Sequence, residues 1–149
     1  MKIALASDHA GYELKKSVMD YLSENGIQYE DFGSGTGERV DYVDHAEKAV
    51  KKVCMGEYEQ AILVCGTGLG MAIVANKYKG IRATPCTDEY SAEMSRKHND
   101  SNCLTLGGRI LPQDEALSIV KVWIETEFEG GRHQGRIDKI LEIEEKNFK

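Results

Sequence analysis

The sequence predicts a doubly wound α/β domain built on a five-stranded, mostly parallel sheet. Short apolar runs alternate along the chain with longer segments in which apolar residues recur at helical spacing. The connections between them are short, and the 149 residues contain no internal repeat, low-complexity segment or linker. A chain of this length and pattern fits a single domain, which we place at 1–149.

The five expected strands are brief apolar runs bounded by turn residues. The run from Ala61 to Val64, for example, is short, apolar and branched enough to be a buried strand. In chain order, the strands are expected at 2–6, 27–32, 61–64, 81–84 and 103–106.

Six helices are expected to follow these strands, with glycine or proline marking most of their ends. Each of the longer ones carries apolar residues on one face. The first helix carries Leu14 to Leu22 and stops at Gly26, and the second carries Tyr42 to Val53 and stops at Gly56. The third runs from Met71 to about Tyr78, and the fourth from a Thr87 cap to Lys97. The fifth runs from Pro112 to Gly130 with Trp123 and Phe128 facing inward, and the sixth spans about 135–147.

Composition excludes several classes of function. A net charge of −6 argues against a nucleic-acid surface, because phosphate backbones attract a basic face. No apolar stretch approaches membrane-spanning length and no signal-peptide pattern opens the chain, so we expect a cytoplasmic protein without membrane contact. The four cysteines show neither CxxC pairing nor zinc-ligand spacing, which predicts reduced thiols and no metal site.

The fold class also predicts where a ligand binds. In a doubly wound sheet, ligands bind beyond the C-terminal strand ends, where the strand order reverses. With a 2-1-3 order, that point lies between the first and third strands. The loops that follow those two strands carry Ser7-Asp8-His9 and Cys65 to Gly70. We therefore expect both loops, with their reactive side chains, to lie at the predicted ligand site.

The segment Cys65-Gly-Thr-Gly-Leu-Gly70 is the strongest local signal in the chain. A strand-to-helix turn of this kind points several backbone N–H groups at one small volume, which suits an anion. A thiol at its edge is expected to ionise more easily than a free cysteine, whose pKa is about 8.5. The alternative is a tight turn beside a core cysteine.

Sharper interpretations of this loop fail on spacing. The glycines do not form the dinucleotide fingerprint and follow the third strand, and the Gly-Lys-Ser/Thr of a P-loop is missing. A thiol phosphatase needs an arginine six positions after the cysteine, where this chain has Met71. The interpretation that remains is a loop whose backbone N–H groups bind an oxyanion next to a thiol. We call this loop the cradle.

Three further groups of residues are candidates for the functional site, and each also has a purely structural interpretation. Asp8 could cap the following helix, whereas His9 has no apolar pattern that would make it a core residue. His98, near a helix C-terminus, could be only a dipole partner. Arg132 and Arg136 are i, i+4 neighbours flanking a histidine, and two guanidiniums on one face favour an anion between them, with a solvated helix start as the alternative.

In order and spacing, these motifs resemble the ribose-5-phosphate isomerase B family, sugar-phosphate isomerases that include allose-6-phosphate and galactose-6-phosphate isomerases. The resemblance covers nearly the whole chain. The matching stretches are Ser7 to Gly11, Arg39 to Tyr42, Cys65 to Gly70 with Ala75 to Lys77, Gly80 to Ala83, Ser95 to Asn102 with Leu106-Gly107, and Gly130 to His133.

The resemblance implies a role for each matching residue in an aldose–ketose isomerisation. Cys65 would be the base that moves a proton between C1 and C2, and the amides of Gly66, Gly68, Leu69 and Gly70 would stabilise the enediolate. Thr67 and His98 would assist opening of the sugar ring, and Asp8 would move hydroxyl protons. Tyr42 and Asn99 would line the sugar, and the phosphate would be held by His9, Arg132, His133 and Arg136, with Arg109 as a further candidate.

The resemblance also implies a Rossmann-like three-layer α/β/α fold with no cofactor, nucleotide or metal. It implies a homodimer or tetramer whose active site is shared between subunits, with the helix at about 135–147 at the dimer interface. The expected reaction interconverts D-ribose 5-phosphate and D-ribulose 5-phosphate. Allose 6-phosphate or galactose 6-phosphate is the alternative substrate, and a non-catalytic phosphate- or nucleotide-binding module is the alternative of another class.

Overall fold

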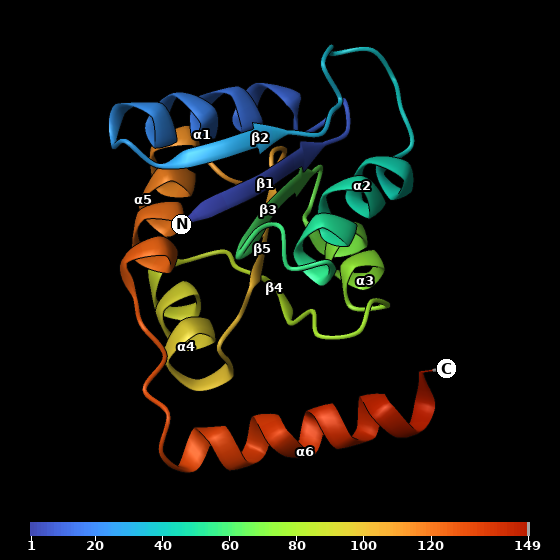
Figure 1. Ribbon diagram of the computed structural model, residues 1–149. Helices are drawn as coiled ribbons and strands as arrows, with labels where there is room; N and C mark the ends of the chain where they lie inside the picture. Colours follow the sequence, from blue (N-terminus) through green and yellow to red (C-terminus); the bar gives the residue numbers. More distant parts are fainter. Residues whose placement is uncertain (149) are drawn as a thin grey trace.

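The computed structural model describes residues 1–148 and has a five-stranded sheet at its centre (Figure 1). The strand order is β2-β1-β3-β5-β4, and every neighbouring pair is parallel. The predicted 2-1-3 order and the α/β fold class are therefore confirmed, and the sheet is wholly parallel. The strands are β1 (Lys2–Ser7), β2 (Gln28–Asp31), β3 (Gln60–Cys65), β4 (Ala83–Pro85) and β5 (Cys103–Gly107).

Helices cover both faces of the sheet, which makes the three layers of a Rossmann-like fold. Helices α1, α4 and α5 contribute to the core on one face, and α2 and α3 to the core on the other. Helix α6 runs along the outside of the body, where it contacts α4, and its Glu144 carboxylate accepts a hydrogen bond from the Gly80 amide at 2.9 Å (Figure 1). The helices are α1 (Tyr12–Glu24), α2 (Tyr42–Cys54), α3 (Leu69–Ala75), α4 (Glu89–Asn99), α5 (Gln113–Glu125) and α6 (Arg132–Asn147).

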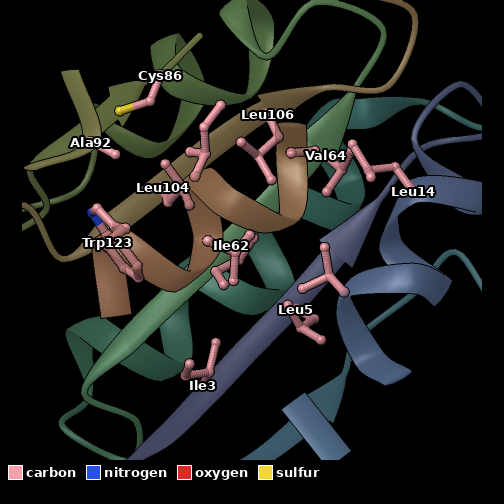
Figure 2. Close-up of a cluster of buried hydrophobic side chains, with 14 of the residues drawn as sticks. Ile3, Leu5, Leu14, Ile62, Val64, Cys86, Ala92, Leu104, Leu106 and Trp123 are labelled. Atoms are coloured by element: carbon pink, nitrogen blue, oxygen red, sulfur yellow. The ribbon is translucent and has the colours of Figure 1, made fainter. Parts of the chain in front are cut away.

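Side chains of the central strands alternate between two cores, as the two-residue period of a strand requires. Ile62 and Val64 of β3 enter the core under α1 and α5, where Trp123 also lies (Figure 2). Leu63 and Cys65 enter the opposite core, under α2 and α3. Burying each large aliphatic side chain contributes about 1.5–3 kcal/mol, so β3 is held rigidly from both sides. Its last residue, Cys65, is thus fixed in position.

Several element boundaries differ from the prediction because side chains compete for backbone groups. Asp88, not Thr87, caps α4 by accepting a hydrogen bond from the Ser91 amide at 2.6 Å. Helix α5 ends at Glu125, where the extended backbone of Thr126 stops it, so Phe128 lies outside the helix.

The start of β4 and the start of α6 also differ. The Arg82 amide bonds to the Asn102 side chain at 2.7 Å instead of a strand, so β4 begins only at Ala83. Helix α6 begins at Arg132, earlier than expected, directly after the positive-φ Gly131. The basic residues at 132 and 136 are therefore both inside the helix.

The strand register defines two edges of the sheet. Ser7 pairs with Val64, and Cys65 pairs with Gly107, so the loops after β1, β3 and β5 leave from the same C-terminal edge. At the other end, Ala61 pairs with Cys103, which places the segment before β5 at the N-terminal edge. None of the helices in residues 1–148 combines the length and apolar character that crossing a membrane requires.

Candidate active site

The loop after β3 directs a backbone amide at the Cys65 thiol. The Gly68 N–H donates to Cys65 Sγ at 3.2 Å, and the thiol is only 5% exposed. Gly68 has φ of 80° and lies so close to the Leu106 backbone that a Cβ would meet it at 3.0 Å, so glycine is required there. The Thr105 hydroxyl donates to the Gly68 carbonyl at 2.7 Å and holds the turn. The sequence thus builds a rigid cradle around the sulfur.

The far side of the cradle is exposed and bordered by Tyr42. The Thr67 hydroxyl accepts a hydrogen bond from the Leu69 amide at 3.2 Å, and both side chains face solvent. The ring of Tyr42 lies over Gly70, where a Cβ would meet ring atoms at 2.8 Å. Helix α2, which Asp41 caps at 2.9 Å from the Val43 amide, positions this ring.

The loop after β1 lies next to the cradle. The Asp8 amide donates to the Val64 carbonyl at 3.2 Å, which ties this loop to β3. The buried Asp8 carboxylate accepts from the Gly11 amide at 3.0 Å through Oδ1. Gly11 is the N-cap of α1 and no side chain caps this helix, so the alternative that Asp8 is a helix cap is wrong. Oδ2 of Asp8 accepts no hydrogen bond from residues 1–148. His9 Nδ1 lies 3.3 Å from the Val40 amide, which orients the ring toward the loop that precedes α2.

Arg109 comes to the same edge from the loop after β5. The Gly108 and Arg109 amides donate to the carbonyls of Cys65 and Gly66 at 2.7 and 3.0 Å. The Arg109 side chain passes over Gly66, 3.3 Å from where a Cβ would stand, and is exposed. The structure therefore brings one group of predicted residues together at the C-terminal edge, the cradle group: Asp8, His9, Tyr42, Cys65, Gly66, Thr67, Gly68, Leu69, Gly70 and Arg109.

A second group of predicted residues gathers where α4 ends and α6 begins. The rings of His98 and His133 stack with centroids 4.2 Å apart and planes inclined by 16°. Asn99 follows His98, and its carbonyl accepts from Arg82 Nε at 3.1 Å. These residues form the basic group: His98, Asn99, Arg132, His133 and Arg136.

The electrostatics of the basic group suit an anion. Arg132 and Arg136 are exposed and form no salt bridge with any residue in 1–148. The pKa of the buried His133 is lowered, first by burial and then by the neighbouring His98 and Arg132. A neutral His133 between cationic neighbours leaves the two guanidiniums as the fixed positive charges of the group.

Within one chain, the cradle group and the basic group are far apart. Cys65 ends β3, whereas His98 precedes the start of β5, and these strands are parallel neighbours. The two residues therefore lie at opposite edges of the sheet, separated by about 13 Å of strand from Ala61 to Cys65. The predicted phosphate ligands are divided in the same way: His9 and Arg109 lie at one edge, and Arg132, His133 and Arg136 at the other.

The other three cysteines lie in surroundings that disfavour the thiolate. Cys86 and Cys103 are buried, and burial raises the pKa of each thiol. Cys54, at the end of α2, is exposed, and partial burial of its sulfur raises its pKa too. Of the four thiols, Cys65 is the one that accepts a backbone N–H within residues 1–148.

One residue near the basic group was not predicted. Glu129 Oε1 lies 3.6 Å from His98 Nε2, and the Glu129 amide donates to the Lys97 carbonyl at 3.2 Å. His98, Glu129 and His133 have donor atoms within 4.8 Å of one another. The stacked rings keep the two imidazole lone pairs in separate, nearly parallel planes, however, and a shared metal ion needs lone pairs that converge on one point. Glu129 follows His98 by thirty-one positions, so no spacing in the sequence indicates that the two residues meet.

Comparison with known proteins shows which family the chain belongs to. The family model described as Ribose/Galactose Isomerase matches residues 3–140, almost the whole chain. The chain belongs to the ribose/galactose isomerase family. A ribose-5-P isomerase B of Listeria innocua is 45% identical over 147 residues, which cover 99% of each protein.

Solved structures of this isomerase family share the complete fold. Ribose-5-phosphate isomerase B of Clostridium thermocellum superposes with a TM-score of 0.96 at 51% identity, covering 98% of this chain and 99% of that one. The enzyme of Mycoplasma genitalium, solved with bound ribulose-5-phosphate, gives a TM-score of 0.95 at 37% identity, covering 98% and 97%. The likeness therefore extends over all six helices and the whole sheet of this isomerase.

Proposed function

We propose that the protein interconverts D-ribose 5-phosphate and D-ribulose 5-phosphate, with Cys65 as the base. The observation that carries this proposal is the buried thiol fixed at the end of β3 under the Gly68 amide. Deprotonating carbon next to a carbonyl requires a base held at one place and donors for the oxyanion that forms. The related structure that contains ribulose-5-phosphate supports the choice of a pentose phosphate.

In this reaction, the Cys65 thiolate removes the proton from C2 of the open-chain aldose. The electron pair of that C–H bond forms the C1–C2 double bond, and the carbonyl electrons move to O1. Amides of the cradle stabilise this enediolate, and each well-placed donor contributes about 3–4 kcal/mol. Asp8 passes the O2 proton to O1, and the Cys65 thiol returns its proton to C1. The product is the 2-ketose, without a redox cofactor.

The phosphate is assigned to the arginines of α6. Two exposed guanidiniums one helical turn apart, with no carboxylate partner in residues 1–148, are suited to bidentate bonds with phosphate oxygens. Arg132, Arg136 and the adjacent His133 would hold the anion, together with His9 and Arg109 from the cradle edge. Binding energy at this non-reacting end fixes C1 and C2 against the cradle.

We infer that a complete site needs two copies of the chain. The cradle group and the basic group lie at opposite edges of one protomer, so a second protomer must supply one of them. Apolar side chains are exposed near each group: Leu69 and Ile73 beside the cradle, and Ile140 and Ile143 on α6. An isologous dimer that covers these surfaces would create two identical shared sites. A homodimer, or a tetramer of such dimers, is the proposed assembly.

His98 and Thr67 are assigned to ring opening, which must precede isomerisation. Opening the furanose breaks the bond between C1 and the ring oxygen, forms the C1 carbonyl, and delivers a proton to the ring oxygen. His98, from the partner copy, would deliver this proton, while Asp8 accepts the proton leaving O1. Tyr42 and Asn99 would line the sugar between the two groups. The reduced cysteines and the phosphorylated substrate fit a cytoplasmic enzyme.

The test is a coupled assay that compares ribose 5-phosphate, allose 6-phosphate and galactose 6-phosphate. We expect ribose 5-phosphate to have the highest kcat/KM. Preference for a hexose phosphate would keep the isomerase and reassign its substrate. Tight binding of a nucleotide with no turnover of any sugar phosphate would instead show the non-catalytic binding module.

A further inference from the structure

The connection between α5 and α6 is fastened to the last turn of α4 at two points. Arg96 Nε donates to the Thr126 carbonyl at 3.1 Å, and the Glu129 amide donates to the Lys97 carbonyl at 3.2 Å. This docking places the Glu129 carboxylate 3.6 Å from His98 Nε2. The backbone that carries Glu129 is thus held against α4, so its carboxylate starts from a fixed position beside His98.

A second contact fixes the other side of His98. The His133 ring stacks on it at 4.2 Å, and His133 is buried at 6% exposure. Burial lowers the pKa of His133, so this ring is neutral near pH 7 and tolerates a charged neighbour. His98 therefore lies between a neutral ring on its face and a carboxylate at its edge.

We propose that Glu129 is a positioning residue that fixes the His98 ring and provides the counter-charge for its protonated form. This inference rests on the proposed function, in which His98 delivers a proton to the ring oxygen of the sugar. A carboxylate at one imidazole nitrogen fixes the orientation of the ring and stabilises the imidazolium. The apo distance of 3.6 Å is of the kind that tightens when substrate binds.

Other charges near His98 do not replace this carboxylate. On α4, Lys97 is paired with Glu93, and on α6 the neighbours Arg132, His133 and Arg136 are basic or neutral. Within residues 1–148, the one acidic group in ion-pair contact with His98 is Glu129. Glu93 and Asp100 are paired with Lys97 and Arg96. Removing the charge of Glu129 therefore leaves the His98 imidazolium without an acidic partner within residues 1–148.

The first test measures kinetics of the full-length Glu129→Gln variant with ribose 5-phosphate. We expect kcat to fall by about 10-fold, which is less than the 10²–10⁴ that general acid–base catalysis provides, because His98 itself is kept. KM should stay within about twofold, since the arginines that hold phosphate are unchanged. Glu129→Asp should restore part of the lost kcat, because it returns a carboxylate to the same place.

The matched control is Glu127→Gln, which removes the same charge from an exposed residue of the same connection. It should keep the wild-type kcat and KM. A merely structural role for Glu129 would lower the thermal midpoint without lowering kcat at temperatures where the variant is folded. Wild-type kcat in Glu129→Gln would overturn the inference.

A second measurement does not depend on turnover. The ring nitrogen resonances of His98 are compared by NMR at one pH in the wild-type protein, in Glu129→Gln and in Glu127→Gln. We expect the Nε2 resonance to differ in Glu129→Gln alone, because the carboxylate 3.6 Å from that nitrogen is gone. Coincident spectra of the wild-type protein and Glu129→Gln would refute the role of Glu129. If the wild-type protein turns over no sugar phosphate, the proposed function fails, and this measurement still decides whether Glu129 fixes the His98 ring.

Discussion

Cys65 and His98 lie at opposite edges of the same parallel sheet, although both are assigned to one reaction. Cys65 is the last residue of β3, and His98 belongs to the helix turn that leads into the start of β5. A crossover helix runs antiparallel to the strands it connects, so its C-terminal end returns to the edge where strands begin. The separation is therefore built into the topology and cannot be removed by a loop movement.

This separation predicts complementation between two inactive variants. Cys65→Ala and His98→Asn should each abolish turnover alone. After they are unfolded together and refolded as a 1:1 mixture, half of the dimers carry one intact site of two. Activity should thus return to about a quarter of wild type, as two-fold symmetry requires. If the mixture stays inactive while mixed dimers are demonstrated by mass spectrometry, the shared site is excluded.

Cys65→Ala also tests the base itself. The variant should lose ribose 5-phosphate turnover while keeping the circular-dichroism spectrum and a cooperative thermal transition, because a small side chain replaces a small one. Cys54→Ala, which removes an exposed thiol from the end of α2, is the control and should keep full activity. Near-normal turnover in Cys65→Ala would contradict the assignment of the base.

Arg136→Ala should act on substrate binding more than on chemistry. Loss of a hydrogen bond between charged groups costs about 1.5–3 kcal/mol, which predicts a rise in KM of roughly 10- to 100-fold. The kcat should change much less, as initial-rate kinetics can measure. Lys139→Ala removes an equal charge from an exposed position of the same helix and should leave KM unchanged. An equal rise in KM in both variants would show that the total positive charge of the helix attracts the substrate, and would contradict a specific phosphate contact of Arg136.

Gly70→Ala should separate activity from stability. The new Cβ would meet the Tyr42 ring at 2.8 Å, and the partly exposed ring can rotate away to relieve the clash. Alanine is better than glycine inside a helix by about 1 kcal/mol, so the thermal midpoint should be kept or raised. Turnover should fall several-fold because Tyr42 leaves the sugar. Gly35→Ala, which has open space around it, should alter neither property.

Acid should destabilise the protein in part through His133. Its pKa is lowered in the folded chain, first by burial, whereas in the unfolded chain it lies near 6.5. As pH falls below about 6.5, the unfolded state therefore binds more protons and the free energy of unfolding decreases; above that pH the group has no effect. Urea unfolding at about pH 7.5 and pH 5.5 should show a smaller decrease for His133→Asn than for wild type. An equal decrease would assign the acid sensitivity to other groups.

Much of the fold was predictable because its signals are local. The strand at 61–64 and the glycines after it were expected from apolar run length and turn residues, and the structure has β3 and the cradle there. The 2-1-3 strand order placed Asp8 beside Cys65, as the bond from the Asp8 amide to Val64 confirms. Boundaries were wrong where side chains competed for the backbone, as Asp88 did in place of Thr87.

The sequence by itself determined the chemistry available: a thiol before three alternating glycines, an Asp-His pair at a strand end, and two arginines one helical turn apart. Such patterns are set within a few residues of one another, so they can be recognised without a fold. Only the tertiary structure decided that Cys65 and His98 face opposite edges and that Glu129 lies against His98. Those relationships depend on the direction of α4 across the sheet and on how the segment after α5 docks on it. Both arise from packing between distant parts of the chain.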